Sequence, residues 1–335
     1  MLAKAIPVRN NFNQIRFWLA TAVVGSHCYP LLGYEEPNSW GMSVGGAAVI
    51  WFFVISGYLI TQSWMRTPSI PSFMANRALR IAPAWIVSAV ISYWLSARFN
   101  GYDANKIHTV NGTWWTLPWE LACYAAVMGL GFIGALNRAS YAAILGAIWV
   151  VYFAHWHSGS PTLTVVGTFF LVFAMGGFIA LNEKHLQLDR TALWCAICIA
   201  PFIFEPMRTW LFAGIDLIPF YWGFGVPDVQ IRQVALMITV PFIVICLARY
   251  AKPLPFWRAD LSYGIYVYGW PVQQSVIYWT RKHGMPIVHP YGVFLITMAI
   301  LIPLSALSWY LLEKPALSLK RFIRHPQTDG SNRGD

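Results

Sequence analysis

Ten apolar segments follow one another along this chain, and most approach the ~20 residues that a helix needs to cross a bilayer. A backbone inside lipid must satisfy its own hydrogen bonds, so helices are the expected form of such segments. We therefore predict an all-α integral membrane protein with about ten transmembrane helices. The predicted spans are residues 15–33, 44–64, 80–97, 118–136, 141–157, 163–181, 191–204, 233–249, 261–280 and 291–312.

The composition agrees with this class. Charged residues make up 11% of the 335 residues and hydrophobic residues 57%, whereas a soluble domain carries roughly 25% charged residues. Ten spans with short loops leave no room for a separate soluble domain. The polar start, Met1–Asn13, has no cleavable signal pattern and runs directly into the first span. We expect residues 1–322 to form one transmembrane domain and residues 323–335 to form a disordered cytoplasmic tail.

Lysine and arginine are distributed unevenly between alternate loops. Ten spans put both termini on one side; if that side is the cytoplasm, most of the 23 basic residues lie inside. The outer ones are Arg98, Lys106, Arg208, Arg232, Arg281 and Lys282. This is the positive-inside pattern, so we predict cytoplasmic termini and a cell inner membrane location. The net charge of +10 then needs no nucleic-acid partner.

The five cysteines lie mostly in apolar runs. Cys195 and Cys198 have the spacing of a metal-binding or redox pair, but no second pair accompanies them and they lie inside a predicted span. We expect no metal site and no permanently bound cofactor.

The run Trp51–Thr61 interrupts an apolar span with Ser56, Gly57 and Tyr58. Small residues let membrane helices pack closely, which accounts for Ser56 and Gly57 without any chemistry. Alternatively, Ser56 and Tyr58 line an acyl channel or donate a hydrogen bond to an oxyanion. Both interpretations stay open.

Two ionisable side chains are expected at similar depth in the outer half of the membrane. His27 lies twelve residues after Ile15, roughly 18 Å up the first helix at 1.5 Å per residue. Glu120 follows Pro118, which suits the first turn of a helix, at the outer end of the fourth span. Ionisable groups inside a membrane are costly unless paired or hydrated. We therefore predict a base–orienter pair in which Glu120 orients His27; a helix-to-helix hydrogen bond is the alternative for His27.

Arg77 and Arg80 are spaced so that both guanidinium groups share one helix face, at the inner end of the third span. Two such groups suit a phosphate or diphosphate, and Arg16 at the inner end of the first span could join them. The alternative is ordinary positive-inside flanking. If phosphate binds at the inner face while the base works nearer the outside, the ligand is an extended acyl carrier.

Three expected outer segments, residues 34–43, 100–116 and 205–230, are rich in Trp, Tyr, Asn, Gly and Pro. Aromatic belts at the membrane interface explain many of these rings. A platform for sugar rings or for an undecaprenyl-type lipid is the alternative.

Six short motifs in this chain resemble, in the same order, those of membrane acyltransferase family 3, the integral-membrane O-acyltransferases that modify cell-surface glycans. Any one of them is a weak signal, but six in family order on the expected spans make a specific match. They are Asn13–Arg16 with Ser26-His27, Phe52–Ile60, Arg77–Pro83, Trp115–Tyr124, Leu261–Gln274 and Glu313–Pro315.

The resemblance implies that an acetyl group passes from cytoplasmic acetyl-CoA, a co-substrate, to a hydroxyl on the outer side. It also assigns residues: the essential histidine is His27, the RxxR pair is Arg77 and Arg80, the first-span arginine is Arg16, and the acidic residue after the Trp motif is Glu120. Some members carry a second histidine where this chain has Trp270-Pro271, which leaves His27 as the base candidate.

The expected acceptor is a cell-surface glycan, such as lipopolysaccharide or another polysaccharide, or a lipid-linked saccharide in the membrane lipid. Its hydroxyl, the acyl group transferred and a covalent acyl-histidine stay open. The expected substrate-binding residues are Ser56, Tyr58, Trp115, Tyr124, Tyr263, Gln273 and Gln274.

The rival interpretation is a proton-coupled transporter or glycolipid flippase, because these too carry His, Glu and Arg inside the membrane. The sequence shows no internal inverted repeat and no matching pair of broken helices. A transporter would also not consume acetyl-CoA.

Overall fold

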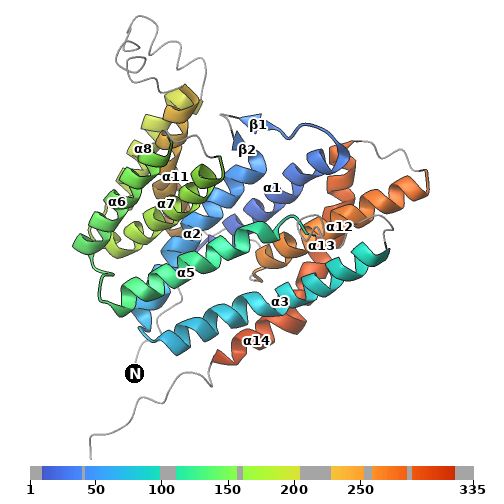
Figure 1. Cartoon of the computed structure of the whole chain (residues 1–335), viewed down its shortest axis with the longest axis horizontal. Helices are drawn as coiled ribbons and strands as arrows, with labels where there is room; N and C mark the ends of the chain where they lie inside the picture. The colour runs from blue at the N-terminus through green and yellow to red at the C-terminus, as the bar shows by residue number, and fades with distance from the viewer. Residues whose placement is uncertain are drawn as a thin grey trace, which may run out of the picture.

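The computed structural model describes residues 10–39, 42–98, 111–156, 161–203, 228–252, 259–284 and 289–320. Within these ranges a helix lies at every predicted span, which confirms the all-α prediction (Figure 1). The helices are α1 (Phe12–Leu32), α2 (Val44–Arg66), α3 (Ile70–Arg98), α5 (Leu117–Phe132), α6 (Arg138–Trp156), α7 (Pro161–Asn182), α8 (Leu188–Ile203), α11 (Asp228–Tyr250), α12 (Ser262–Lys282) and α13 (Pro290–Ser308). The predicted tail lies outside the described residues, and so do residues 100–110 and 205–227 of two predicted aromatic segments.

Five of the described helices are long and apolar enough to cross a membrane. They cover Val44–Arg66, Ile70–Leu95, Thr164–Asn182, Gln233–Tyr250 and Pro290–Ser318, the last joining α13 to the π-helical turn η2 (Trp309–Glu313) and α14 (Lys314–Ser318). The chain is thus an all-α membrane protein. The number of spans and the side of the termini stay predictions.

The helices form two hydrophobic clusters (Figure 1). One surrounds α2 and α7, with α6, α8 and α11 beyond them; the other joins α12 to α1 and α13. α1 and α2 contact each other and link the two clusters.

Two glycines let the backbones of α2 and α7 come into direct contact. A Cβ atom on Gly57 would lie 2.0 Å from the carbonyl oxygen of Phe173, and one on Gly176 would lie 2.1 Å from that of Val54. Both separations are far inside van der Waals contact, so close packing accounts for Gly57.

α12 is covered by α1, α3 and α13. Several of its polar side chains therefore face protein rather than lipid: Gln273 is fully buried, and Tyr268 Oη bonds Ser308 Oγ at 3.0 Å. A helix enclosed by others needs no lipid-compatible surface, which explains how this tyrosine-rich segment sits inside the bundle.

α3 begins ten residues before the predicted span, at Ile70. Pro71 stands in its first turn, where proline is tolerated. At 1.5 Å per residue, its 29 residues extend roughly 43 Å. Arg77 and Arg80 consequently lie within the helix and not at its end.

The segment before α5 is held inside the bundle. Asn111 is buried, and its amide nitrogen donates to the carbonyl oxygen of Val267 at 2.9 Å and to Ser88 Oγ at 3.2 Å. The 3₁₀ turn η1 (Trp114–Thr116) follows, and α5 begins part-way along the bundle (Figure 1). Its 16 residues extend roughly 24 Å, which is less than a bilayer core of about 30 Å.

Candidate active site

Four charged side chains from four parts of the chain form one ion-pair cluster. Asp260, just before α12, accepts from Arg16 of α1 at 2.9 Å and from Arg80 of α3 at 2.6 Å. Arg80 also pairs with Glu313 of η2 at 3.1 Å. Because these residues mark the start of α1, the start of α12 and the end of η2, those helix ends meet at one end of the bundle.

The carboxyl group of Asp260 is buried, and Ser262 Oγ donates to it at 2.5 Å. Burial opposes its ionisation, but the charges of Arg16 and Arg80 and the hydrogen bonds from Ser262 outweigh burial and lower the pKa of Asp260. Asp260 is therefore a charged anchor at neutral pH.

Arg80 is fully engaged by protein groups. Besides its two carboxylate partners, its guanidinium lies 5.7 Å from the ring centre of Tyr263 and 5.6 Å from that of Trp309, within cation–π range. Tyr263 in turn donates to the carbonyl oxygen of Ile81 at 2.9 Å. Arg80 thus ties α3 to α12 and η2.

Arg77 differs from Arg80. Its Nη2 meets Ser63 Oγ at 3.4 Å, a long contact, and its Nε is buried without a hydrogen-bond partner. The guanidinium lies over the rings of Phe73 and Tyr124, at 5.7 and 6.0 Å. No carboxylate within the described ranges forms an ion pair with it. A buried cation with an unused donor can bind an added anion.

A small polar cavity connects several predicted site residues. Its volume is about 50 Å³, room for a few water molecules. α1 contributes Arg16, α2 contributes Ser56, α5 contributes Glu120 and α12 contributes Tyr263; the other lining residues are Val49, Phe52, Phe53, Thr116, Ser262 and Tyr266. Admission of an acyl thioester here requires the cavity to widen.

Glu120 is held by Tyr124, whose hydroxyl donates to Glu120 Oε1 one helical turn away. No hydrogen bond or ion pair among the described residues joins Glu120 to His27. The predicted substrate residue Tyr124 therefore contacts the predicted orienter and the region of Arg77.

His27 lies eleven residues beyond Arg16 on α1, about 16 Å along the helix axis. Its ring meets Trp270 edge to face, with centroids 5.1 Å apart at 81°. The neighbouring Ser26 donates to Oε1 of Glu36, in the loop after α1, which brings that carboxylate to the same turn of the helix. The base candidate and the arginine cluster therefore occupy different levels of α1.

The remaining predicted substrate residues are dispersed. Tyr58 is buried, stacks on Phe12 and accepts from Gln62, whose amide also binds Glu183; Glu183 pairs with Arg249 at 3.0 Å.

Trp115 is 42% exposed and lies 5.5 Å from Phe169, ring centre to ring centre. Gln273 donates to the carbonyl oxygen of Val24 at 2.7 Å, and Gln274 is half-buried one position further along α12. Of the seven predicted substrate residues, Ser56 and Tyr263 line the polar cavity.

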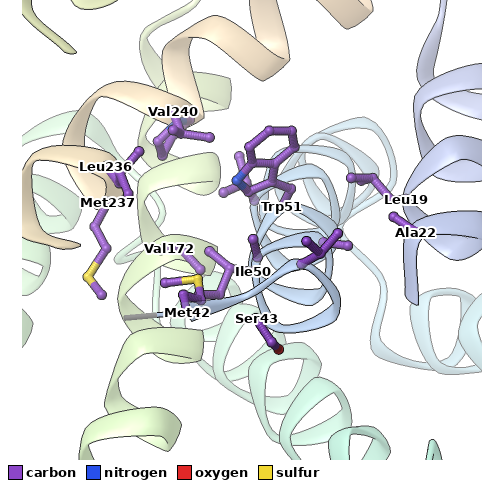
Figure 2. A pocket seen from close by; sticks show the side chains of 15 residues that line it. Leu19, Ala22, Met42, Ser43, Ile50, Trp51, Val172, Leu236, Met237 and Val240 are labelled. Carbon is purple, nitrogen blue, oxygen red and sulfur yellow. The ribbon is translucent and has the colours of Figure 1, made fainter. Parts of the chain in front are cut away.

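A larger, apolar pocket of about 220 Å³ opens between α1, α2, α7 and α11 (Figure 2). Leu19, Trp51, Val172, Met237 and Val240 are among the side chains around it, and Ser43 is its hydroxyl group. Its lining holds no ionisable group, so it offers space for hydrocarbon and no acid–base chemistry.

Sequence patterns did not single out Asp260 and Glu36, and Glu313 appeared there only within a motif. Asp260 and Glu313 could have been found from their position, because each is a carboxylate at the end of a predicted span where the arginines also lie. Glu36 carried no periodic signal because it lies in a loop.

Comparison with known proteins identifies one family and two relatives. A family model described as an acyltransferase domain matches residues 9–311. The chain is 30% identical to an O-acetyl transferase of Shigella phage Sf6, over 92% of this chain and 96% of that protein. It is 29% identical to nodulation protein 10 of Rhizobium leguminosarum bv. viciae, over 93% of this chain and 94% of that protein. No solved structure matches.

Proposed function

The chain belongs to acyltransferase family 3, and from this premise we propose that it transfers an acetyl group from cytoplasmic acetyl-CoA to a cell-surface glycan or lipid-linked saccharide. In this proposal the protein spans an inner membrane about ten times with both termini in the cytoplasm. The donor enters at the arginine end of the bundle, and the acceptor hydroxyl reaches His27 from the other side.

The observation that carries the proposal is the separation between Arg16, at the cavity end of α1, and the base His27 further along the same helix. Arg77 has a buried donor without a partner, and Arg16 lines the polar cavity beside Ser56 and Glu120. His27 lies further along α1. An extended thioester with phosphates at one end and a reactive carbonyl at the other suits this separation.

For the donor, Arg77 binds a CoA phosphate with the hydrogen-bonding capacity that its protein neighbours leave unused. Arg80 contributes indirectly, by holding α3 against α12 and η2. Arg16, Ser56 and Glu120 line the path of the pantetheine arm once the cavity widens. We therefore assign Glu120 to the path of the donor, because it lines the same cavity as Arg16.

For the transfer, His27 acts as general base. Its neutral imidazole takes the proton of the acceptor hydroxyl while the hydroxyl oxygen attacks the thioester carbonyl carbon. A C–O bond forms, the C–S bond breaks, and the CoA thiolate leaves and is protonated to the thiol. The products are an O-acetyl ester and CoA.

The test uses the full chain purified in detergent, with acetyl-CoA as donor and a crude cell-envelope glycan preparation as acceptor. Thiol release and transfer of radiolabelled acetyl are followed for the wild type, His27→Ala and the matched control His185→Ala, whose imidazole is exposed in the α7–α8 loop. We expect at least a hundredfold loss for His27→Ala, the usual scale of a general base, and wild-type rates for His185→Ala. An inactive wild type that instead moves glycolipid would favour a flippase.

A further inference from the structure

The loop after α1 returns a carboxylate to the neighbourhood of His27. Gly33 ends α1 in the left-handed conformation, with φ of 87°. The amide of Tyr34 then bonds the carbonyl oxygen of Tyr29 at 2.9 Å. This reversal directs the chain back over the end of α1 and into the short hairpin of β1 (Asn38–Ser39) and β2 (Met42–Ser43), which leads into α2. Glu36 lies between the reversal and the hairpin.

Ser26, the neighbour of His27, fixes Glu36 in place. Its hydroxyl donates to Glu36 Oε1 and accepts the backbone N–H of Gly45 at 2.9 Å, which uses both the donor and the acceptor capacity of a serine. Ser26 is buried and Glu36 half-buried. One hydroxyl therefore joins the loop, the start of α2 and the His27 turn of α1.

The backbone of α2 leaves room for this contact at a glycine. A Cβ atom on Gly45 would lie 3.0 Å from Ser26 Oγ and 3.2 Å from Glu36 Oε1. A larger residue at position 45 would press against both groups. The start of α2 is thus shaped around the serine–carboxylate pair.

α12 fixes the same turn of α1 from the other side. Trp270 meets the His27 ring edge to face. Three residues on, the amide of Gln273 donates to the carbonyl oxygen of Val24 at 2.7 Å and to Cys28 Sγ at 3.0 Å. This turn of α1 therefore carries an aromatic contact from α12 on His27 and a carboxylate from the loop on Ser26.

We propose that Glu36, rather than Glu120, is the positioning residue of His27: its carboxylate orients the imidazole and stabilises the imidazolium that forms when the acceptor hydroxyl loses its proton. This inference rests on the proposed function. Glu36 keeps its own charge throughout, and the proton stays on His27 until the CoA thiolate takes it. Glu120 accepts a hydrogen bond from Tyr124 and lines the cavity with Arg16. In this proposal its carboxylate belongs to the path of the acyl donor.

The experiment compares Glu36→Gln, Glu36→Asp and the matched control Glu35→Gln in the full-length protein, with acetyl-CoA and cell-envelope glycan as probes. Glu35 is the exposed neighbour, so its substitution removes the same charge from the same loop. kcat, the KM for acetyl-CoA and the thermal unfolding midpoint in detergent are measured for each variant, with His27→Ala as reference.

We expect Glu36→Gln to lower kcat at least tenfold, with the KM for acetyl-CoA within twofold of wild type and an unchanged unfolding midpoint. Glu36→Asp should restore part of kcat, and Glu35→Gln should match wild type. Wild-type kcat in Glu36→Gln, while His27→Ala is inactive, overturns the inference and leaves the proposed function standing. A kcat loss that comes with a lowered unfolding midpoint and no rescue by aspartate also overturns it, because the role of Glu36 is then structural. An inactive wild type overturns both proposals.

Discussion

Arg77 and Arg80 lie one helical turn apart on α3, yet within the described part of the chain only Arg80 is paired with acids. Arg80 binds Asp260 at 2.6 Å and Glu313 at 3.1 Å, whereas Nε of Arg77 is buried without a partner. Two residues that look equivalent in the sequence are therefore expected to have different roles, the first in ligand binding and the second in holding helices together.

Substitution of the two arginines should separate these roles. Arg77→Ala removes a charged hydrogen-bond donor worth about 1.5–3 kcal/mol, so we expect the KM for acetyl-CoA to rise at least tenfold with little change in the unfolding midpoint. Arg80→Ala leaves the buried Glu313 without its cationic partner and Asp260 with Arg16 alone, which costs about 3–5 kcal/mol and should lower the midpoint strongly. Enzyme kinetics and thermal unfolding in detergent measure both. Equal effects of the two substitutions on stability would contradict this division.

The lowered pKa of Asp260 predicts a pH-dependent contribution to stability. An unfolded aspartate titrates near pH 4, so the contribution is complete above that pH and is lost as pH falls through the lower folded pKa. Asp260→Asn lacks the charge at every pH. The difference in unfolding midpoint between wild type and this variant should therefore be largest near pH 7 and shrink toward pH 3. A difference that stays constant over this range would rule out the ionised state as its source.

Two glycines offer a matched test of the α2–α7 contact. Gly57→Ala places a Cβ atom 2.0 Å from the carbonyl oxygen of Phe173, so the helices must separate, at a cost of about 1–3 kcal/mol. Gly129→Ala, in α5, meets nothing within 4 Å and should be neutral or slightly stabilising. Thermal unfolding of both variants checks this prediction. Equal midpoints would show that α2 and α7 do not pack this closely.

Asn111 is expected to fix the entry of α5. Asn111→Ala removes its bonds to Val267, Ser88 and Ser92 and leaves the buried N–H of Thr113 without this acceptor, a loss of about 1–3 kcal/mol. Since α5 carries Glu120 into the polar cavity, we also expect a lower kcat. The control is Asn10→Ala, an exposed asparagine before α1, which should change neither quantity. Wild-type stability of Asn111→Ala would contradict the buried anchor.

Several features could be predicted from local pattern. The positions of the described helices follow from apolar runs. The small residue Gly57 allows close helix packing, as one of the two interpretations predicted. The six motifs indicated the family that the family model then matched. The start of α3 was placed ten residues too late because its first turns are less apolar, and polarity alone does not end a helix.

The partners of the charged residues could not be predicted in this way. Similar depth along their helices predicted that Glu120 orients His27. In the structure Glu120 accepts from Tyr124, and Glu36 accepts from Ser26, the neighbour of His27. Depth is a single coordinate: it does not say which helices are neighbours or how each is rotated. It also omits loops, and Glu36 reaches Ser26, beside His27, because the chain reverses at Gly33.

The sequence by itself determined the membrane class, the helix positions and the family, because hydropathy and short motifs are properties of contiguous residues. Only the tertiary structure decided that Arg80 is an ion-paired anchor, that Arg77 keeps an unused donor and that Glu36 bonds Ser26 beside His27. Arg16 and Asp260 are 244 positions apart, so their contact depends on which helix faces pack together. That choice is set by the summed packing of all the helices, which no local stretch of sequence specifies.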